Sequence, residues 1–473
     1  MDITKQAVGK TAATIAKQRS YSEVVDYLDK HWNVNKDSKT LDRIKKLDAA
    51  FGSLSQKTNA IIIGGTNGKS LTMHFTARLF QEENLKVGAF YSPHILTYNE
   101  RLTINNEAVS NKLFTEIGNE VINMAETLKI DAYSHELLTM MALVYFNQNN
   151  VDVALLETHN GGLYDATNVC HAKVVSITRV TSQNVLATEE SMKVAAQDIM
   201  GIVKKDTHIV SGDQSKAMLQ LMQSLTEAQG GIWAMPIRKL AALTYPFEQL
   251  HGRCAALAER IAELYSEHFI NKNSTILSGT LLSKPKSARG RPTLDEKRKR
   301  DINPEKTFEK FWKEVSNELP GRFQILDKEK PTVLLDTANN IDAFKNLLLG
   351  IRLLHYQRPL KGLTIVVGAA FNKMHSEEFL KLVRYFFKKT SGQIFICPIT
   401  DPIAGLDEDT SWDVEQVTND IKSMKIKARA CKSFEEAFEL AKKSVDERNG
   451  LLVITGSHSI VNHYWRLKGI KKF

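Results

Sequence analysis

The sequence has few cysteines and no long apolar run, and each shortage excludes a class of protein. Its four cysteines are scattered without metal-binding spacing: Cys170, Cys254, Cys397 and Cys431. A disulfide framework or a zinc site is therefore not expected, and this usage suits a reducing compartment. No stretch reaches the ~20 apolar residues of a membrane span, and the N-terminus lacks the apolar core of a signal peptide. We expect a cytoplasmic protein with no membrane partner.

Charge and composition are ordinary for a globular enzyme. Charged residues make up 25% of the 473 residues and apolar residues 42%, so disorder is not the main theme. The length allows two or three domains, each with a sizeable core. The net charge of +9 fits nucleic acid, anionic substrates or a basic proteome equally well, so composition does not choose a partner.

The stretch 59–105 begins with a strand, a glycine loop and a helix. Residues 60–63 are an apolar, β-branched run, and apolar residues recur at helical spacing over 71–79. The loop between them holds glycines, a lysine and a hydroxyl: Gly65, Thr66, Asn67, Gly68, Lys69 and Ser70. Its backbone N–H groups and the helix N-terminus can face phosphate oxygens, Lys69 adds a full charge, and Ser70 can hold Mg²⁺. Because Ile63 stands where G-x-x-x-x-G-K-[ST] has glycine, the loop is a variant, and a plain glycine turn is the alternative.

Two further blocks indicate a family. Tyr91-Ser92-Pro93-His94-Ile95-Leu96 is followed by Tyr98-Asn99-Glu100-Arg101-Leu102. With the glycine loop, they closely resemble the folylpolyglutamate synthase and dihydrofolate synthase family of the Mur ligase superfamily. The resemblance implies ATP and Mg²⁺ as cofactors, folate or dihydropteroate and L-glutamate as substrates, and a monomer. It also implies substrate-binding roles for Pro93, His94, Asn99 and Arg101.

A strand that ends in a carboxylate predicts the cation site. Residues 151–157 read as a buried strand ending at Glu157, and the carboxyl end of such a strand lies beside the phosphate loop of an α/β sheet. By the resemblance, Glu157 and Ser92 ligate the magnesium bound to ATP, and Ser70 is a further candidate ligand. We predict that Lys69 and Glu157 are the catalytic residues.

Several positions depart from the family pattern. Thr158-His159-Asn160 replaces the usual V-G-x, and Asn339 replaces a histidine near the reaction. The family's second-magnesium histidine and its carbamoylated lysine fall on Asn184 and Ile199, which cannot do the same chemistry. The sequence therefore predicts an intact first metal site and the loss of the second.

The C-terminal part alternates strand and helix, which favours a parallel sheet covered by helices. The resemblance places Arg322, of the block Pro320-Gly321-Arg322, and Asp336, at the end of a strand, against the nucleotide. We expect an α/β protein with a helical N-terminal segment at 1–58. A P-loop, Mur-ligase-like ATP-binding domain follows at 59–322, with a parallel sheet and helices on both faces. A smaller Rossmann-like ligase domain occupies 323–473.

Residues 272–306 look like a basic insertion into the family pattern. Arg289-Gly290-Arg291-Pro292 resembles the core of an AT-hook, which lays arginines in the DNA minor groove. We prefer the interpretation of a solvated, flexible insertion and do not expect a nucleic-acid partner.

Two functions stay open. The first is an ATP-dependent amide ligase that joins L-glutamate to a folate or dihydropteroate carboxylate through an acyl phosphate. The alternative is a catalytically impaired or repurposed family member that keeps nucleotide binding, with nucleic-acid binding through the insertion as a third reading.

Overall fold

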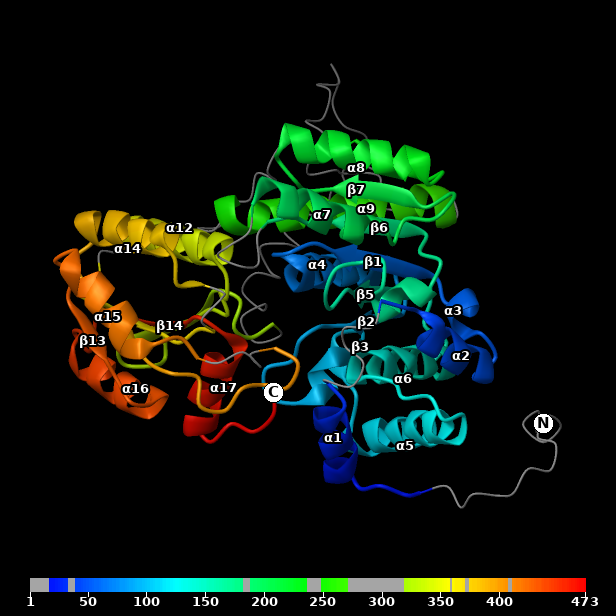
Figure 1. Ribbon diagram of the computed structural model, residues 1–473, viewed down its shortest axis with the longest axis horizontal. Coiled ribbons are helices and arrows are strands. Elements are labelled where there is room, and N and C mark those ends of the chain that lie inside the picture. Colours follow the sequence, from blue (N-terminus) through cyan, green and yellow to red (C-terminus); the bar gives the residue numbers. More distant parts are fainter. Residues whose placement is uncertain are drawn as a thin grey trace, which may run out of the picture.

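The computed structural model describes residues 17–32, 39–181, 188–235, 248–270, 319–357, 360–370, 374–406 and 411–473. These residues form two α/β units side by side, coloured blue to green and yellow to red in Figure 1. The predicted α/β fold is confirmed. The predicted basic insertion and Asn184 lie outside the described residues.

The N-terminal segment is helical. Its helices are α1 (Tyr21–Lys30), α2 (Asp42–Ala50) and the short α3 (Leu54–Lys57). α1 begins with a capping box, in which Ser20 and Glu23 each accept the other's backbone N–H. Val24 and Leu28 are fully buried, so the amphipathic α1 is fixed against the first unit by its apolar face.

The first unit contains an eight-stranded sheet in the order β4-β3-β2-β5-β1-β6-β7-β8. Its strands are β1 (Ala60–Gly64), β2 (Val87–Phe90), β3 (Leu102–Ile104), β4 (Glu107–Ala108), β5 (Val153–Glu157), β6 (Val174–Ile177), β7 (His208–Ser211) and β8 (Ile232–Trp233). The strands from β2 to β8 in this order are parallel, as predicted. The edge differs, because β3 and β4 add antiparallel. The turn between them has positive φ at Asn105 and Asn106, which makes a tight hairpin.

Successive side chains of β1 enter two separate cores. Ile61 and Ile63 pack in the core that contains residues of α4 (Lys69–Glu82) and α9 (Glu248–Phe269). Ala60 and Ile62 pack on the opposite face, with residues of α5 (Asn111–Thr127), α6 (Ser134–Gln148) and α7 (Glu189–Met200). A strand covered on both faces reads as a continuous apolar run, which is why the sequence predicted it correctly. The unit also contains η1 (Tyr98–Arg101), η2 (Ala166–Val169) and α8 (Lys216–Ala228).

The second unit is a six-stranded sheet in the order β13-β12-β11-β14-β10-β9. Its strands are β9 (Gln324–Leu326), β10 (Thr332–Leu335), β11 (Leu363–Val367), β12 (Gln393–Ile396), β13 (Ala428–Ala430) and β14 (Leu451–Thr455). Only the edge strand β9 is antiparallel among the described strands of this sheet. The described helices are α12 (Ile341–Gln357), α14 (Glu377–Lys389), α15 (Val414–Ser423), α16 (Phe434–Lys443) and α17 (His458–Leu467).

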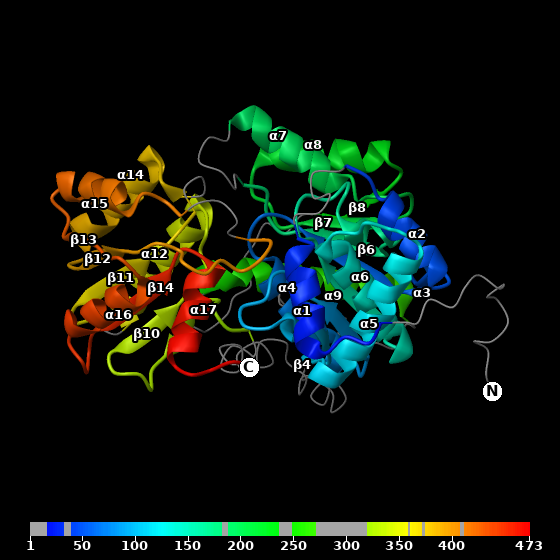
Figure 2. The ribbon, with the colours of Figure 1, turned by 60° about the horizontal axis from the view of Figure 1, so that its bottom comes forward.

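Loops at the carboxyl ends of strands bring the two units together. Figures 1 and 2 both place α17 on the side of the second unit that faces the first. Asn462 on α17 donates a hydrogen bond to the carbonyl of Ile95, and Ile95 is buried in the apolar cluster of the second unit. No helix in the described ranges is both long enough and apolar enough to cross a membrane.

Candidate active site

The glycine loop follows β1 and ends at the first turn of α4. Gly65 has φ +119°, and a Cβ there would lie 2.3 Å from Thr178 Oγ1, so only glycine fits the turn. Gly68, at φ +89°, is the N-cap of α4. The Lys69 ammonium donates to the Gly65 carbonyl at 2.9 Å and closes the loop on itself. Strand, loop, lysine and helix therefore stand in the arrangement that the sequence predicted for a phosphate cradle, and phosphate binding itself stays a prediction.

Glu157 connects the glycine loop to the loop after β2. Its carboxylate, 2% exposed, accepts a hydrogen bond from Ser70 Oγ at 3.1 Å and one from the Ser92 backbone N–H at 3.2 Å. Burial raises the pKa of Glu157, and the charge of Lys69 opposes this shift. Burial likewise lowers the pKa of Lys69, which Glu157 opposes. The two buried charges thus stabilise each other.

The oxygens around Glu157 fit a magnesium ion that also binds phosphate. Among the described residues, no three acidic, histidine or cysteine side chains gather as a metal site. Ser70, Ser92 and Glu157 instead offer one carboxylate and two hydroxyls. Mg²⁺ is commonly held in this way, by one or two carboxylates together with substrate phosphates and waters.

The predicted substrate block forms a hydrogen-bonded layer behind Ser92. Arg101 is fully buried and donates from Nε to His94 Nδ1 at 2.9 Å and from Nη1 to Ser92 Oγ at 3.4 Å. Its guanidinium also lies 5.0 Å from the ring centroid of Trp32. The Asn99 side chain, 1% exposed, accepts a hydrogen bond from the Tyr21 hydroxyl and donates one to the Val109 carbonyl. In this structure it therefore stabilises the packing of the fold. Substrate binding by Pro93, His94, Asn99 and Arg101 stays a prediction.

One residue of this block has a role that sequence reasoning missed. The Glu100 carboxylate accepts the backbone N–H groups of Ile95, Leu96 and Thr97 at 2.6–2.8 Å. It therefore fixes the loop that carries Ser92. The sequence contains a signal for this role. Glu100 stands three residues after Thr97, which is the spacing of a capping box.

The second unit contributes Arg322 and Asp336. Arg322 donates to Thr337 Oγ1 at 2.6 Å and to Ser70 Oγ at 3.4 Å, which brings a guanidinium to the glycine loop. Asp336 accepts the backbone N–H groups of Phe323 and Ala338, both at 2.9 Å. Burial raises the pKa of Asp336 to about 6, against the opposing charge of Arg322.

Polar contacts also join the glycine loop to the start of α12. The Asn67 amide donates to Asn340 Oδ1 at 3.1 Å and to Asp342 Oδ2 at 3.0 Å, and it accepts from Asn340 Nδ2 at 2.9 Å. Arg179 forms an ion pair with Asp342 at 3.0 Å. We name these four residues the interdomain clasp.

These groups surround a cavity of about 640 Å³ between the units. Its lining includes most of the predicted site: Thr66, Asn67, Gly68, Lys69, Ser70, Ser92, Pro93, Glu157, Arg322 and Asp336. Gly65, His94, Asn99 and Arg101 are not among the lining residues. The fold therefore gathers residues from distant parts of the sequence around a space of small-molecule size.

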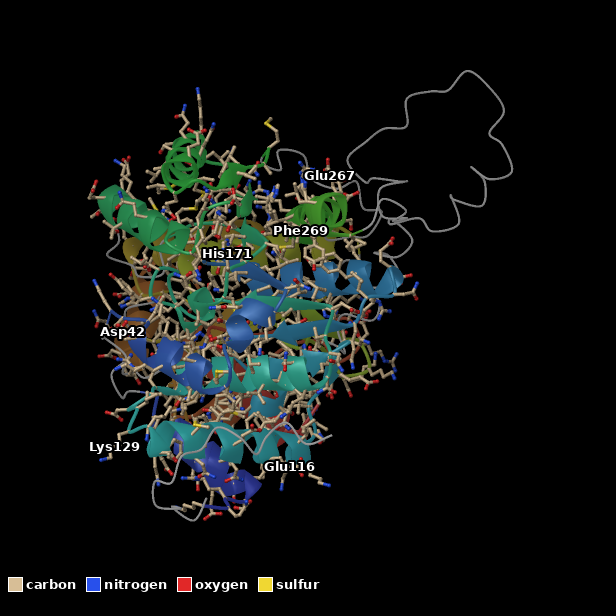
Figure 3. All side chains as sticks on the ribbon, turned by 90° about the vertical axis from the view of Figure 1, so that its right-hand side faces the viewer. Asp42, Glu116, Lys129, His171, Glu267 and Phe269 are labelled. Atoms are coloured by element: carbon tan, nitrogen blue, oxygen red, sulfur yellow. The ribbon has the colours of Figure 1, made fainter. Side chains whose placement is uncertain are left out.

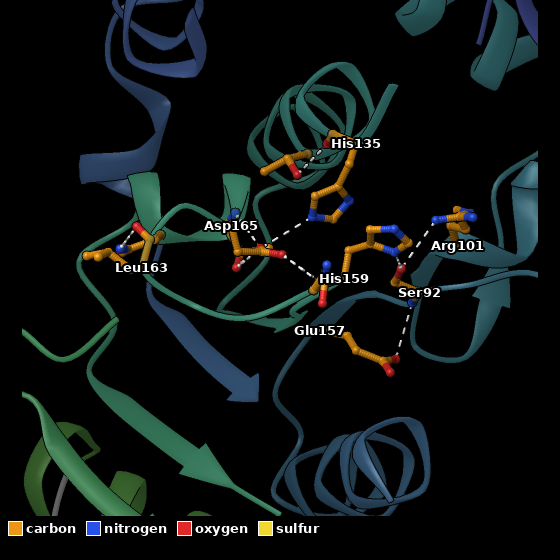
Figure 4. Close-up of polar contacts among 11 residues, drawn as sticks. Ser92, Arg101, His135, Glu157, His159, Leu163 and Asp165 are labelled. Atoms are coloured by element: carbon orange, nitrogen blue, oxygen red, sulfur yellow. Dashed lines mark hydrogen bonds and ion pairs between the residues drawn. The ribbon is translucent and has the colours of Figure 1, made fainter. Parts of the chain in front are cut away.

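The departures from the family pattern have distinct surroundings. Ile199, 6% exposed, packs in the apolar core, with its Cγ2 3.4 Å from the position of a Cβ on Gly64. Asn339 lines the cavity. His159 also lines it and hydrogen-bonds Ser92 through Nδ1 at 2.9 Å (Figure 4). Burial, together with His135 and Arg101, holds the pKa of His159 well below its usual range.

Asp165 organises the backbone beside His159. It accepts the N–H groups of His159 and Asn160 at 2.8 and 3.2 Å, and His135 Nε2 lies 3.3 Å from its other oxygen. Although burial acts to raise the pKa of Asp165, His135 and Thr167 hold it below its usual value. No role was predicted for Asp165 or His135, because only the fold brings them together.

Comparison with known proteins finds similarity both in sequence and in structure. Residues 321–458 match the family model described as Mur ligase, glutamate ligase domain. A dihydrofolate synthase/folylpolyglutamate synthase of Bacillus subtilis is 30% identical over 224 residues, covering 46% of this chain and 49% of that protein. The matched region thus spans about half the length of this relative.

Solved structures extend the likeness to nearly the whole chain. A folylpolyglutamate synthase of Mycobacterium tuberculosis complexed with ADP aligns with a TM-score of 0.73 at 20% identity, covering 95% of this chain and 98% of that one. A bifunctional folylpolyglutamate synthase/dihydrofolate synthase of Yersinia pestis complexed with AMPPNP and Mn aligns at 0.71 and 20%, covering 96% and 100%. At such identities the likeness shows the shared fold.

Proposed function

We propose that this chain is a member of the folylpolyglutamate synthase and dihydrofolate synthase family and acts as an ATP-dependent amide ligase. Its reaction would join L-glutamate to the carboxylate of a folate or dihydropteroate through an acyl phosphate. The observation that carries the proposal is the convergence of Lys69, Glu157 and Arg322 on one cavity between the two units.

The geometry suits phosphoryl transfer to a carboxylate. The glycine loop and Lys69 would hold the β- and γ-phosphates, and Arg322 would neutralise charge that spreads over the transferred group. Glu157, Ser70 and Ser92 would hold the magnesium ion, which supplies electrostatic stabilisation of the phosphates. Closure of the cavity by the second unit would exclude water from an acyl phosphate.

The test is phosphate release from ATP with Mg²⁺ and glutamate, with tetrahydrofolate or dihydropteroate as acceptor. Lys69→Ala serves as the blank, because it removes the mobile charge of the phosphate loop. We expect release that requires one acceptor and falls by about 10² to 10³ in the variant. Absence of acceptor-dependent release from the wild type, despite measurable ATP binding, would contradict the ligase.

One observation favours the alternative of an impaired or repurposed member that keeps nucleotide binding. The apolar side chain of Ile199 is packed in the core next to Gly64, at the position predicted to replace the carbamoylated lysine. A second cation would lack that ligand. ATP binding with no release for either acceptor is the result that this alternative predicts.

The remaining assignments accompany this function. We propose a monomer with domains at 59–322 and 323–473 after the N-terminal segment. A cytoplasmic location is supported by the four cysteines, all of which are free.

A further inference from the structure

One side chain at the cavity has no counterpart in the family pattern that the sequence resembles. His159 stands where the pattern E-V-G-x has glycine, two residues after Glu157. Its imidazole lines the cavity, and Nδ1 lies 2.9 Å from Ser92 Oγ (Figure 4). A hydrogen-bonding ring therefore stands beside a predicted cation ligand, at a position where glycine would leave space.

The imidazole is held from several sides. Asp165, 3% exposed, accepts the backbone N–H of His159 at 2.8 Å. The rings of His135 and Trp32 lie 5.1 and 5.2 Å from the His159 ring, centroid to centroid. These contacts fix the ring before any ligand arrives. A fixed partner can orient another group at little entropic cost.

The hydrogen bonds of the Ser92 hydroxyl leave room for a cation. Arg101 Nη1 donates to Ser92 Oγ at 3.4 Å, and a hydroxyl has one proton and two lone pairs. With the proton of Ser92 directed to His159 Nδ1, one lone pair is left. The backbone N–H of Ser92 donates to Glu157, so the residue that carries this hydroxyl is in contact with the carboxylate.

We propose that His159 is a positioning residue that orients the Ser92 hydroxyl as a ligand for the divalent cation of the bound nucleotide. The inference rests on the proposed function, because it requires a nucleotide with its cation in this cavity. Groups that orient metal ligands typically contribute 10- to 100-fold to metal affinity.

The test measures Mn²⁺ binding in the presence of ADP, from the electron paramagnetic resonance signal of free Mn²⁺. The full chain is compared with His159→Gly and His159→Asn, each with Ser92 intact and with Ser92→Ala. We expect His159→Gly to weaken Mn²⁺ binding about 10- to 100-fold, and His159→Asn to recover most of it, since its amide can still bond Ser92. With Ser92→Ala, His159→Gly should cause no further loss.

A matched control is His171→Gly. His171, labelled in Figure 3, is exposed, bonds the carbonyl of Lys205 and does not line the cavity, so its loss should leave Mn²⁺ affinity unchanged. Thermal unfolding identifies any variant that fails to fold. Should His159→Gly fail, His159→Gln, which cannot place its amide at the Nδ1 position, takes its place beside His159→Asn.

Three results would overturn the inference. The first is an unchanged Mn²⁺ affinity in His159→Gly. The second is that His159→Gly lowers the Mn²⁺ affinity equally whether Ser92 is intact or replaced by alanine. The third is a ¹⁴N coupling in the Mn²⁺ spin-echo spectrum that vanishes in His159→Gly, because the imidazole would then be a ligand itself. If the wild type binds no Mn²⁺ with ADP, the nucleotide site fails as well, which distinguishes that failure from the failure of His159 alone.

Discussion

At the scale of single residues, the cavity holds ionisable groups whose charged forms are disfavoured by burial and favoured by neighbouring charges. Glu157 and Lys69 each oppose the pKa shift of the other, and Arg322 adds a second cation beside Glu157. Burying charged groups costs free energy that their mutual attraction offsets only in part. The gathering of these charges around the end of β5 is therefore better explained by binding of a charged ligand than by folding.

The free-energy cost of burying a charge is measurable at Asp336, as a pH dependence of the free energy of unfolding. Burial raises its pKa to about 6 in the folded chain, against roughly 3.9 for an exposed aspartate. A carboxyl with a higher pKa in the folded state contributes stability that is complete below about pH 4 and is lost as the pH rises through 6. Between pH 4 and 7 we expect the wild type to lose roughly 2 kcal/mol of unfolding free energy relative to Asp336→Asn.

Urea unfolding of both proteins across this pH range gives the difference directly. The other titrating groups are common to the two proteins, so they cancel in the comparison. Parallel stability curves would contradict a raised pKa at Asp336. A difference of opposite sign, with the wild type gaining stability as the pH rises, would show that Arg322 outweighs burial.

At the scale of elements, the conformation of the glycine loop after β1 is constrained by close contact with the residues that follow β6. Gly65 has φ +119°, and a Cβ there would lie 2.3 Å from Thr178 Oγ1 and 2.9 Å from the Arg179 carbonyl. Gly65→Ala should destabilise the protein by roughly 3 kcal/mol and weaken ADP binding, because strain and steric overlap add. Gly469→Ala is the control, because Gly469 also has a positive φ (+75°) but a Cβ there would meet no atom within 4 Å outside its chain neighbours. It should cost only about 1 kcal/mol. Chemical denaturation tests both, and equal losses would refute a close contact at Gly65.

The elements that could be predicted from the sequence are those with an unbroken apolar pattern. The strand predicted over 60–63 lies in β1, and the helix predicted over 71–79 lies in α4. β8 has only two residues, and β4 is exposed along its two residues, so neither carries a pattern. Such short edge strands depend on the neighbour with which they pair.

The same division applies to the site. Lys69 and Ser70 follow a local motif, and Glu157 ends an apolar strand, so the pattern alone brings them to one sheet edge. The contact of His135 with Asp165 joins residues 30 positions apart, and that of Asn67 with Asn340 joins residues 273 apart. No local pattern encodes such pairs. They follow from the packing of α6 and from the meeting of the two units.

At the scale of the whole molecule, the position of the cavity depends on how the two units meet. The loop after β2 carries Ser92 to the predicted cation site and, three residues later, buries Ile95 in the core of the second unit. The interdomain clasp ties the glycine loop to α12 in the same way. We therefore expect nucleotide binding in this cavity to be coupled to the arrangement of the units through short loops.

The clasp predicts a kinetic effect on nucleotide release. Asp342→Ala removes one hydrogen bond to Asn67 and the ion pair with Arg179, whose side chain is 39% exposed. A hydrogen bond contributes about 1 kcal/mol and a partly exposed pair up to ~1 kcal/mol. We expect ADP dissociation to become roughly tenfold faster, with little change in the unfolding midpoint, because each core stays intact.

Stopped-flow displacement of a fluorescent ADP analogue measures this rate. Asp420→Ala is the matched control, since Asp420 on α15 is also paired at 3.0 Å, with His375, and does not line the cavity. An unchanged rate in Asp342→Ala would mean that apolar contacts such as Ile95 hold the units together without the clasp. Slower release would mean that the clasp competes with the nucleotide for Asn67. Faster release in Asp342→Ala alone would show that polar contacts between the units contribute to nucleotide retention.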